Sequence, residues 1–323
     1  MRLGGNGSLS RADLGKMSTE KTTLYHFWQP RFWPVWLGVG LLRAVCWLPQ
    51  SGRMAAGRLL GRIIMRVARK RRAVAERNIE ICFPEMAAGD RQALVCRHFE
   101  SIGMGVIELG IAWWATDKAI DKMVELHGAE HVQAAMQQGK GVLLLSGHFA
   151  AIEMSGRPMK PMFAPMAAMY RPSKNPLIDQ LMRRCRGRST DELITKKSIR
   201  QLLKVLRENR LVWYAADQAY NRKGTVLAPF FGEPAATNSA VSQIARLSGT
   251  RVVPFFPMRL ENGRGYRVEA LPALENFPSG DDVADAERLN KVLEQLIRRA
   301  PEQYYWVHRR FKGRPEGYPD PYA

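Results

Sequence analysis

Residues 141–153 read GVLLLSGHFAAIE, and this stretch decides the fold. A strand-length apolar run ends in Gly147-His148, and Glu153 follows five residues after the histidine. A continuous apolar run of this length is typical of a strand that is buried on both faces of a sheet. Because α/β proteins hold their ligands beyond the carboxyl ends of such strands, we expect His148 to lie at a ligand crevice.

The His148-x4-Glu153 pair predicts a general base. A carboxylate within reach of an imidazole fixes its tautomer and stabilises the imidazolium that forms when it takes a proton. Ser146 lacks the G-x-S-x-G pattern of a nucleophilic serine, so attack by a substrate hydroxyl is the chemistry indicated. Residues five apart on an ideal helix differ by about 140°, so the pair requires His148 in the turn before the helix. The spacing also fits a strand-end histidine followed by an ordinary first-turn carboxylate.

Other expected strand ends carry further polar residues. Arg171 would suit a phosphate or an oxyanion that develops on a carbonyl group. Asp217 and Gln218 close another apolar strand and are expected beside His148. Arg171 also fits a structural ion pair, and Asp217 also fits a helix cap. An aromatic, turn-rich loop that contains Phe230 and Phe231 is a candidate lining for an acyl-chain groove.

The remaining histidines do not predict a metal site. His127 and His131 are four residues apart, but the HExxH order is missing and a surface pair is the simpler interpretation. The four cysteines are scattered without a CxxC pair and are expected to be reduced. His308 begins a basic run with Arg309 and Arg310, which we interpret as a phosphate-binding or structural segment.

Positive charge is concentrated at the N-terminus. The formal net charge is +19, and the first 77 residues contain 15 Lys or Arg and three acidic residues. Such a segment indicates an anionic partner. Zinc-finger spacing, RNA-binding aromatic motifs and a helix-turn-helix signature are all missing, which argues against nucleic acid and favours anionic membrane lipids.

Residues 27–50 are predicted to attach the protein to a membrane. Four tryptophans resemble an interfacial belt: Trp28, Trp33, Trp36 and Trp47. The uncharged run 32–42 is only 11 residues long, whereas a span needs about 20. A single transmembrane helix with Arg43 snorkelling, a helix embedded in one leaflet and a buried core helix all remain open.

Residues 53–72 predict a basic amphipathic helix. Arg58, Arg62 and Arg66 recur at helical spacing, with aliphatic residues between them. This pattern suits an interface with anionic headgroups, although it also fits a solvated surface helix. Positive charge beside the apolar segment predicts that the catalytic domain lies on the cytoplasmic side of the membrane.

Apolar runs alternate with helical patterns after a mostly helical region at 73–138. The expected strands are 141–146, 165–170, 211–216, 251–257 and 266–271, and the expected helices are 150–157, 175–186, 197–208, 238–248 and 285–299. This alternation predicts an α/β fold with a central, mostly parallel or mixed sheet flanked by helices. The predicted parts are a disordered N-terminal extension (1–26), a membrane-anchor segment (27–50), a catalytic domain (51–317) and a C-terminal tail (318–323).

The combined motifs resemble the late (secondary) acyltransferases of lipid A biosynthesis, the lauroyl and myristoyl transferases within the wider glycerolipid acyltransferase superfamily. The resemblance covers about residues 25 to 317. It rests on Phe27-Trp28-Gln29-Pro30-Arg31-Phe32-Trp33-Pro34, Gly139-Lys140-Gly141 with His148-x4-Glu153, Tyr170-Arg171-Pro172 with Asn175-Pro176, Ala216-Asp217-Gln218, Arg222-Lys223-Gly224, Pro229-Phe230-Phe231-Gly232 with Ala235-Ala236-Thr237, and PEQYYWVHRRFK at 301–312. Ala219 departs from the acidic residue that relatives often carry after Asp-Gln.

The resemblance implies a specific reaction on the cytoplasmic face of the bacterial inner membrane. Acyl carrier protein would donate a C12–C14 chain as a thioester to the hydroxyl of a 3-hydroxyacyl chain on a lipid A precursor. His148 would remove the hydroxyl proton, Glu153 would orient the imidazole, Arg171 would bind a phosphate or the oxyanion, and Asp217 would support the site. No metal or organic cofactor is implied. Transfer to another glycolipid and a non-catalytic lipid-binding role remain as alternatives.

Overall fold

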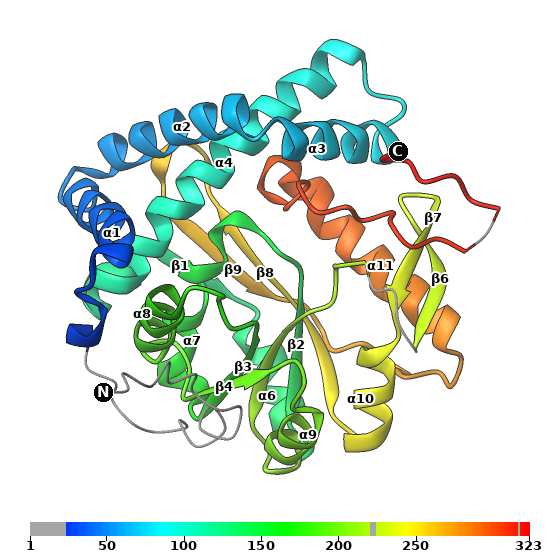
Figure 1. The fold of residues 1–323 in the computed structure, drawn as a ribbon. Coiled ribbons are helices and arrows are strands. Elements are labelled where there is room, and N and C mark those ends of the chain that lie inside the picture. The colour runs from blue at the N-terminus through cyan, green and yellow to red at the C-terminus, as the bar shows by residue number, and fades with distance from the viewer. Residues whose placement is uncertain (1–23, 220–223, 316) are drawn as a thin grey trace, which may run out of the picture.

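The computed structural model describes residues 24–219, 224–315 and 317–323. A twisted central sheet lies between helices, with a helical layer across one end and a two-stranded hairpin beside the last long helix (Figure 1). Residues 1–23 of the predicted N-terminal extension (1–26) lie outside the described part of the chain. Its last three residues belong to a short 3₁₀ helix, η1 (Leu24–Phe27). Residues 222 and 223 of the Arg-Lys-Gly motif also lie outside the described residues.

The central sheet has seven strands. In chain order they are β1 (Val124–His127), β2 (Val142–Ser146), β3 (Met166–Tyr170), β4 (Glu192–Thr195), β5 (Leu211–Ala215), β8 (Arg251–Arg259) and β9 (Tyr266–Ala270). Their spatial order is β1-β9-β8-β2-β5-β3-β4. All neighbouring strands are parallel except β8 and β9, which confirms the predicted mostly parallel, mixed sheet.

The helices account for most of the remaining chain. They are α1 (Trp33–Val45), α2 (Gln50–Val67), α3 (Arg69–Cys82), α4 (Ala88–Trp114), α5 (Asp117–Asp121), α6 (Ala129–Met136), α7 (Gly156–Phe163), α8 (Pro176–Arg186), α9 (Ile199–Arg207), α10 (Ala240–Ser248) and α11 (Asp282–Arg299). Short 3₁₀ helices are η2 (Pro30–Phe32), η3 (Ala150–Met154), η4 (Glu261–Gly263) and η5 (Pro301–Gln303).

The five expected strands are confirmed to within two residues, but four others were missed. β1 and β4 are only four residues long, so their periodicity is too brief to recognise. β6 (Thr225–Phe230) and β7 (Glu233–Asn238) form an antiparallel hairpin where we expected a loop. Its turn is made by Phe231 and Gly232, both at positive φ.

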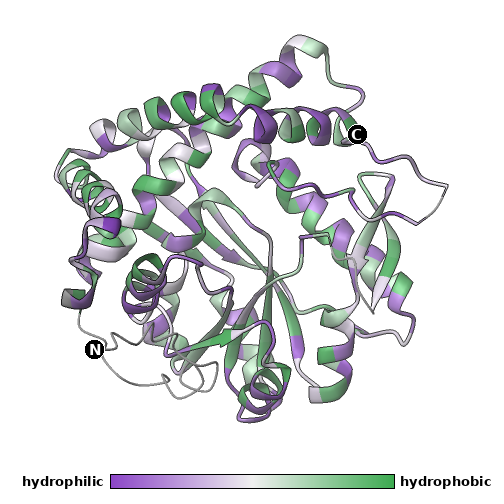
Figure 2. Ribbon diagram, viewed as in Figure 1, coloured by the Kyte–Doolittle hydropathy of each residue, from purple (hydrophilic) through white to green (hydrophobic). Residues whose placement is uncertain are grey.

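Strand β2 is buried on both faces, as its apolar run predicts. Leu143 and Leu145 pack into the cluster under α9, α10 and α11. Val142 and Leu144 face the opposite cluster, under α6 and α7. The central strands are accordingly hydrophobic along their length, whereas hydrophobic and hydrophilic residues alternate along the outer helices (Figure 2). Because both faces are covered by helices, only the ends of these strands can reach solvent.

Helix α2 packs unusually closely on α4. A Cβ atom on Gly61 would lie 2.1 Å from the carbonyl oxygen of Phe99, and one on Gly103 would lie 2.1 Å from that of Gly57. These glycines allow the two backbones to touch. The rest of α2 is therefore fixed against α4 along one face, which leaves the opposite face exposed.

The helix formed within residues 27–50 is short. In the described part of the chain, no helix is long and apolar enough to cross a membrane. Helix α1 has 13 residues, so the interpretation of 27–50 as a transmembrane helix is not supported. The basic segment 53–72 also does not form one helix, since Ala68 leaves the helical conformation between α2 and α3.

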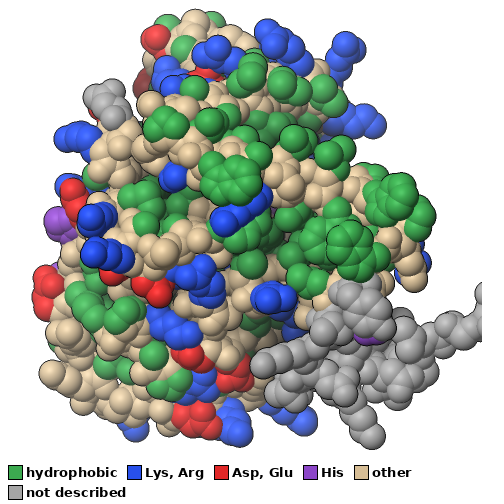
Figure 3. Space-filling model, turned by 90° about the vertical axis from the view of Figure 1, so that its left-hand side faces the viewer, with side chains coloured by type: hydrophobic (Ala, Val, Ile, Leu, Met, Phe, Trp, Pro, Cys, Tyr) green, Lys and Arg blue, Asp and Glu red, His purple; other side chains and the backbone are tan. Residues whose placement is uncertain are grey.

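Helices α1 and α2, with the residues that flank α1, present an exposed apolar surface. Its large exposed side chains are Trp28, Trp33, Leu37, Leu41, Trp47, Leu48, Leu59, Ile63 and Val67. Figure 3 shows hydrophobic side chains gathered across the upper part of the face on which α1 lies, with Lys and Arg side chains around them. We call this set the α1–α2 surface.

Candidate active site

The sheet register brings His148 and Asp217 together. β2 and β5 are parallel neighbours, and Ser146 at the end of β2 pairs with Ala215 at the end of β5. His148 and Asp217 each follow two residues after these paired ends. Parallel strands finish at the same edge of a sheet, so two side chains 69 residues apart meet there.

Asp217 holds His148 through two hydrogen bonds. Its Oδ1 atom lies 2.6 Å from Nδ1 of His148, and its Oδ2 atom accepts from the His148 backbone N–H at 2.9 Å. The expectation that Glu153 orients this imidazole is therefore wrong for the described structure. The carboxylate that contacts the ring comes from the neighbouring strand, which the sequence placed only in a supporting role.

This contact fixes the tautomer of His148. An ionised carboxylate only accepts hydrogen bonds, so Nδ1 carries the proton and Nε2 keeps its lone pair. The His148 side chain is 38% exposed, whereas that of Asp217 is 3% exposed. The basic nitrogen therefore lies on the solvent side, 3.4 Å from the amide nitrogen of Gln218, which is a long contact.

The pKa values of both groups favour the ion pair. Burial lowers the pKa of His148, but the charge of Asp217 and its hydrogen bond outweigh this and raise the pKa overall. Burial raises the pKa of Asp217, and the charge and hydrogen bonds of His148 more than reverse this, so it is lowered. The pair is thus well suited to accept a proton on Nε2 and hold it as an imidazolium.

Glu153 makes an ion pair with Arg186 instead. The Nε atom of Arg186 donates to the two carboxylate oxygens of Glu153 at 3.1 and 3.3 Å, and Nη2 donates to Oε1. His148 does lie in the turn before a helix, as the spacing requires, but η3 directs the Glu153 side chain to the end of α8. Arg186 was missed because nothing in the sequence distinguishes it from Arg183, Arg184 and Arg188 around it.

The C-terminal segment forms a wall of the site. The backbone N–H of Tyr305 donates to the His148 carbonyl oxygen at 3.0 Å, and Phe149 and Tyr304 form an isolated β-bridge. The Tyr305 ring centroid lies 6.4 Å from that of His148. These contacts hold the backbone around His148 against the C-terminal segment.

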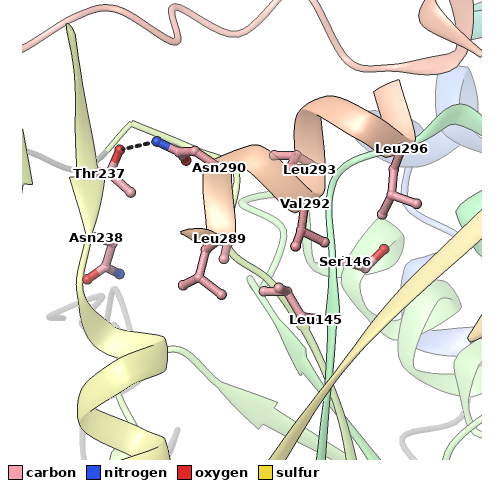
Figure 4. A pocket seen from close by; sticks show the side chains of 10 residues that line it. Leu145, Ser146, Thr237, Asn238, Leu289, Asn290, Val292, Leu293 and Leu296 are labelled. Carbon is pink, nitrogen blue, oxygen red and sulfur yellow. Dashed lines mark hydrogen bonds between the residues drawn. The ribbon is translucent and has the colours of Figure 1, made fainter. Parts of the chain in front are cut away.

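Two hollows lie beside β2, one on each face of the sheet, and neither is lined by His148 or Asp217. The smaller, about 20 Å³, lies between β2, β7 and α11, and Figure 4 shows leucine and valine side chains of α11 directed toward Leu145 and Ser146. The larger, about 80 Å³, lies on the α7 side and is lined by side chains that include Met159, Met166 and Phe255. We call the second the α7 hollow. Glu153 and Arg186 are its charged lining residues.

Two predicted ligand-binding residues are buried in the core. Phe230 has no exposed surface and packs among aromatic rings, so it cannot line an acyl-chain groove. Arg310 is 2% exposed and donates to the Ala236 carbonyl oxygen, Thr237 Oγ1 and Asn290 Oδ1. Arg310 therefore ties the hairpin to α11, and its assignment as a phosphate ligand is wrong.

The other predicted binding residues lie apart from His148 or at its margin. Burial and the charge of Lys312 lower the pKa of His308 to about 4, so it is neutral near pH 7 and unsuited to binding phosphate by charge. Phe231 is half-buried beneath Arg298. The remaining residues are exposed, so binding by them stays a prediction: Arg58, Arg62, Arg66, Arg171, Gln218 and Arg309.

The described residues contain no group of three or more His, Cys, Asp or Glu side chains placed to hold a metal ion. What the site offers chemically is an oriented imidazole, a buried carboxylate behind it and a guanidinium–carboxylate pair beside an apolar hollow. This arrangement can deprotonate a hydroxyl group next to an acyl chain.

Comparison with known proteins decides the family. The profile of the family described as Bacterial lipid A biosynthesis acyltransferase matches residues 20–313. The chain belongs to this family. It is 40% identical to the Lipid A biosynthesis lauroyltransferase of Escherichia coli strain K12, over 93% of this chain and 97% of that protein.

Two further relatives carry different acyl names. The chain is 36% identical to the E. coli K12 Lipid A biosynthesis palmitoleoyltransferase, over 90% of this chain and 95% of that protein. It is 26% identical to the E. coli K12 Lipid A biosynthesis myristoyltransferase, over 92% of each. The protein is therefore an acyltransferase that transfers an acyl chain in lipid A biosynthesis, as the motifs indicated. The alternatives of a non-catalytic tether and of another glycolipid acceptor are set aside.

Proposed function

We propose that this lipid A acyltransferase moves a C12–C14 acyl chain from acyl carrier protein to the hydroxyl of a 3-hydroxyacyl chain on a lipid A precursor. The observation that carries the proposal is the 2.6 Å contact between His148 Nδ1 and Asp217 Oδ1, with Nε2 on the open side of the ring. Such a pair serves a hydroxyl nucleophile that comes from the substrate.

The reaction is a thioester-to-ester exchange. The acceptor hydroxyl oxygen attacks the thioester carbonyl carbon while His148 Nε2 takes the hydroxyl proton, and Asp217 stabilises the resulting imidazolium. The carbonyl π electrons move to oxygen and form a tetrahedral oxyanion. The oxyanion then collapses, the C–S bond breaks, and the departing sulfur takes the proton from His148. No redox partner and no metal enter this balance.

We place the acyl chain in the α7 hollow. This hollow is the larger of the two, its floor is formed by Met159, Met166 and Phe255, and Trp213 adds an aromatic wall. Methionine and aromatic side chains suit a hydrocarbon chain because they are apolar and adaptable. Phe230, a residue of the loop predicted to line the groove, has no exposed surface and is unsuited to that role.

We propose that the α1–α2 surface attaches the protein to one leaflet of the bacterial inner membrane, on its cytoplasmic face. On α1, Trp33, Leu37 and Leu41 recur every four residues and are all exposed. Contiguous exposed apolar surface of this kind on a folded chain marks an interaction site. A helix too short to span can still bury such a face at the level of the headgroups.

Helix α2 continues this surface with two parallel rows. Leu59, Ile63 and Val67 form an exposed aliphatic row, and the arginines at 58, 62 and 66 form an exposed basic row one residue ahead of it. Aliphatic insertion together with guanidinium contacts suits anionic phospholipids and the phosphates of a lipid A precursor. Part of the basic row is engaged, since Arg62 bonds Glu100 at 2.6 Å.

The test is mass spectrometry of lipid A from a bacterium that lacks its late acyltransferases and expresses this protein. We expect one added C12–C14 acyl mass with the wild type and with His127→Ala, an exposed-histidine control. We expect none with His148→Ala. An unchanged lipid A with well-expressed wild-type protein, or full acylation by His148→Ala, contradicts the proposal. Purified enzyme supplied with acyl carrier protein thioester then tests the donor.

A further inference from the structure

The Glu153–Arg186 pair lines the α7 hollow and is partly exposed to solvent. The side chains of Glu153 and Arg186 are 16% and 28% exposed, whereas Met159 on the floor has no exposed surface. No other charged residue lines this hollow in the part of the chain that the structure describes. An apolar cavity with a single, partly exposed ion pair in its lining is suited to a ligand with a hydrocarbon tail and a polar head.

Arg186 keeps donors free for such a ligand. Its Nε and Nη2 atoms donate to Glu153, but among the described residues no partner is found for Nη1. A guanidinium has five N–H donors in a rigid plane, so fixing one edge directs the others. Glu153 therefore orients the Arg186 guanidinium and leaves part of its hydrogen-bond donors available to a ligand.

The positive charge of Arg186 also acts on His148. Burial lowers the pKa of His148, Asp217 raises it, and the positive charge of Arg186 lowers it. Glu153 belongs to η3, which begins two residues after His148, so the ion pair and the base are tied to the same short segment. The carbonyl group of a chain seated in the α7 hollow would then lie near Arg186, which the ion pair with Glu153 ties to the segment that follows His148.

We propose that Arg186 binds the thioester carbonyl oxygen and stabilises its negative charge in the tetrahedral intermediate, and that Glu153 is a positioning residue that acts through Arg186. This inference rests on the proposed function. It gives the carboxylate of the His-x4-Glu motif a role different from the one its spacing suggested. The proton path stays on His148 and Asp217, and the electron pair that forms the oxyanion returns to break the C–S bond.

The test is a double-mutant cycle with purified full-length enzyme in detergent micelles, with acyl carrier protein thioester and a lipid A precursor as substrates. Loss of one oxyanion donor lowers kcat by about a hundredfold to a thousandfold. We expect Arg186→Gln to lower kcat by about a hundredfold, with both KM values within about twofold, and Arg186→Lys to retain more of the rate. Arg184→Gln, at an exposed arginine on the same helix, is the matched control and should change neither kcat nor the two KM values.

The behaviour of Glu153 decides its role. We expect Glu153→Gln to lower kcat about tenfold in the wild-type background and to have no further effect on Arg186→Gln. Added guanidinium should restore activity to Arg186→Ala only while Glu153 is present. An equal loss from Glu153→Gln in both backgrounds would mean that it acts on His148 directly and would overturn the proposal.

Two other outcomes also overturn it. A raised KM for the lipid acceptor with unchanged kcat in Arg186→Gln assigns the arginine to phosphate binding. If Arg186→Gln has an unaltered melting temperature, and is therefore folded, and its kinetics are unchanged, then Arg186 has no role in the reaction. In both cases wild-type transfer continues, so the proposed function survives, whereas absent wild-type transfer would refute the function itself.

Discussion

The β2–β5 edge and the α1–α2 surface differ in how each one fixes its side chains. At the β2–β5 edge, Asp217 is buried and bonds both the ring and the backbone of His148. On the α1–α2 surface, Trp33, Leu37 and Leu41 project from an exposed helix face. The β2–β5 edge holds reacting atoms at fixed positions, whereas the α1–α2 surface presents apolar area and positive charge to a partner.

This difference teaches which kinetic quantity each region should control. A transition state gains from groups held at fixed distances, so changes at the β2–β5 edge should lower turnover. Membrane binding grows with buried apolar area and with attraction to anionic lipid, without fixed partners. Changes on the α1–α2 surface should therefore weaken membrane binding while leaving turnover in detergent intact.

The largest expected effect comes from Asp217→Asn. The substitution removes the charge that stabilises the His148 imidazolium and permits the wrong tautomer, so kcat/KM should fall by about a hundredfold or more. Vesicle binding should not change. A loss of vesicle binding that matches the loss of turnover would show that the two regions do not act separately.

The pH profile sharpens the same comparison. His148 must be neutral to accept a proton, and its raised pKa places the acidic limb of the wild-type kcat/KM profile above the ordinary value of 6.5. Without the charge of Asp217, burial and the positive charge of Arg186 remain, and both lower the pKa of His148. The acidic limb of Asp217→Asn should therefore move to lower pH. A limb that stays in place would assign it to another group.

The next largest effect should come from Leu37→Glu with Leu41→Glu. Both side chains are more than half exposed, so folding should be unaffected. Each leucine buried in lipid contributes roughly 1.5 kcal/mol or more, so binding to anionic vesicles should fall at least about a hundredfold. Sedimentation with vesicles measures this, and kcat in detergent is the control. Unchanged sedimentation would contradict the membrane role of α1.

A smaller effect is expected from Arg58→Glu with Arg66→Glu. Each basic residue near an anionic surface strengthens binding by about 1 kcal/mol, so two reversals should weaken binding about 30-fold or more. The loss should shrink as salt is added, because screening removes the same attraction. Equal effects on neutral and anionic vesicles would show that charge is not the cause.

The smallest effect should come from Ala168→Phe. This half-buried alanine lines the α7 hollow, and a ring there would occupy space that we assign to the acyl chain. We expect a several-fold shift in preference toward shorter acyl donors, measured by competition between chain lengths, with little change in total rate for the shortest donor. Leu289→Phe, which lines the smaller hollow, is the matched control. A shift in Leu289→Phe alone would move the chain to that side.

The local sequence predicted most strands of the central sheet well, because a run of apolar residues indicates a buried strand without information from distant parts of the chain. The apolar run before His148 fixed a strand buried on both faces, and the same pattern located β3, β5, β8 and β9. The hairpin β6–β7 was missed because Pro229, Phe231 and Gly232 carry turn signals, while the strands around them pair through backbone bonds that any side chain allows.

The sequence predicted a site residue correctly where its residue type and position along a strand were informative, and failed where the burial of a charged side chain decided its role. The sequence identified His148 and Asp217 as polar residues at strand ends. It could not show that Arg310 points inward, because a basic run near a terminus looks like a surface feature. Only the surrounding acceptors on Ala236, Thr237 and Asn290 make its burial possible.

By itself, the sequence determined that this is an α/β acyltransferase of lipid A biosynthesis with a histidine at the end of a buried strand. The tertiary structure alone decided which carboxylate serves that histidine. The physical reason is the parallel pairing of β2 with β5, which brings Asp217 across 69 positions to Nδ1 while η3 turns Glu153 toward Arg186. The spacing of two residues in the sequence indicates whether they can meet within one helix, strand or turn. Which side chains meet between two strands depends on the sheet register, which the spacing does not show.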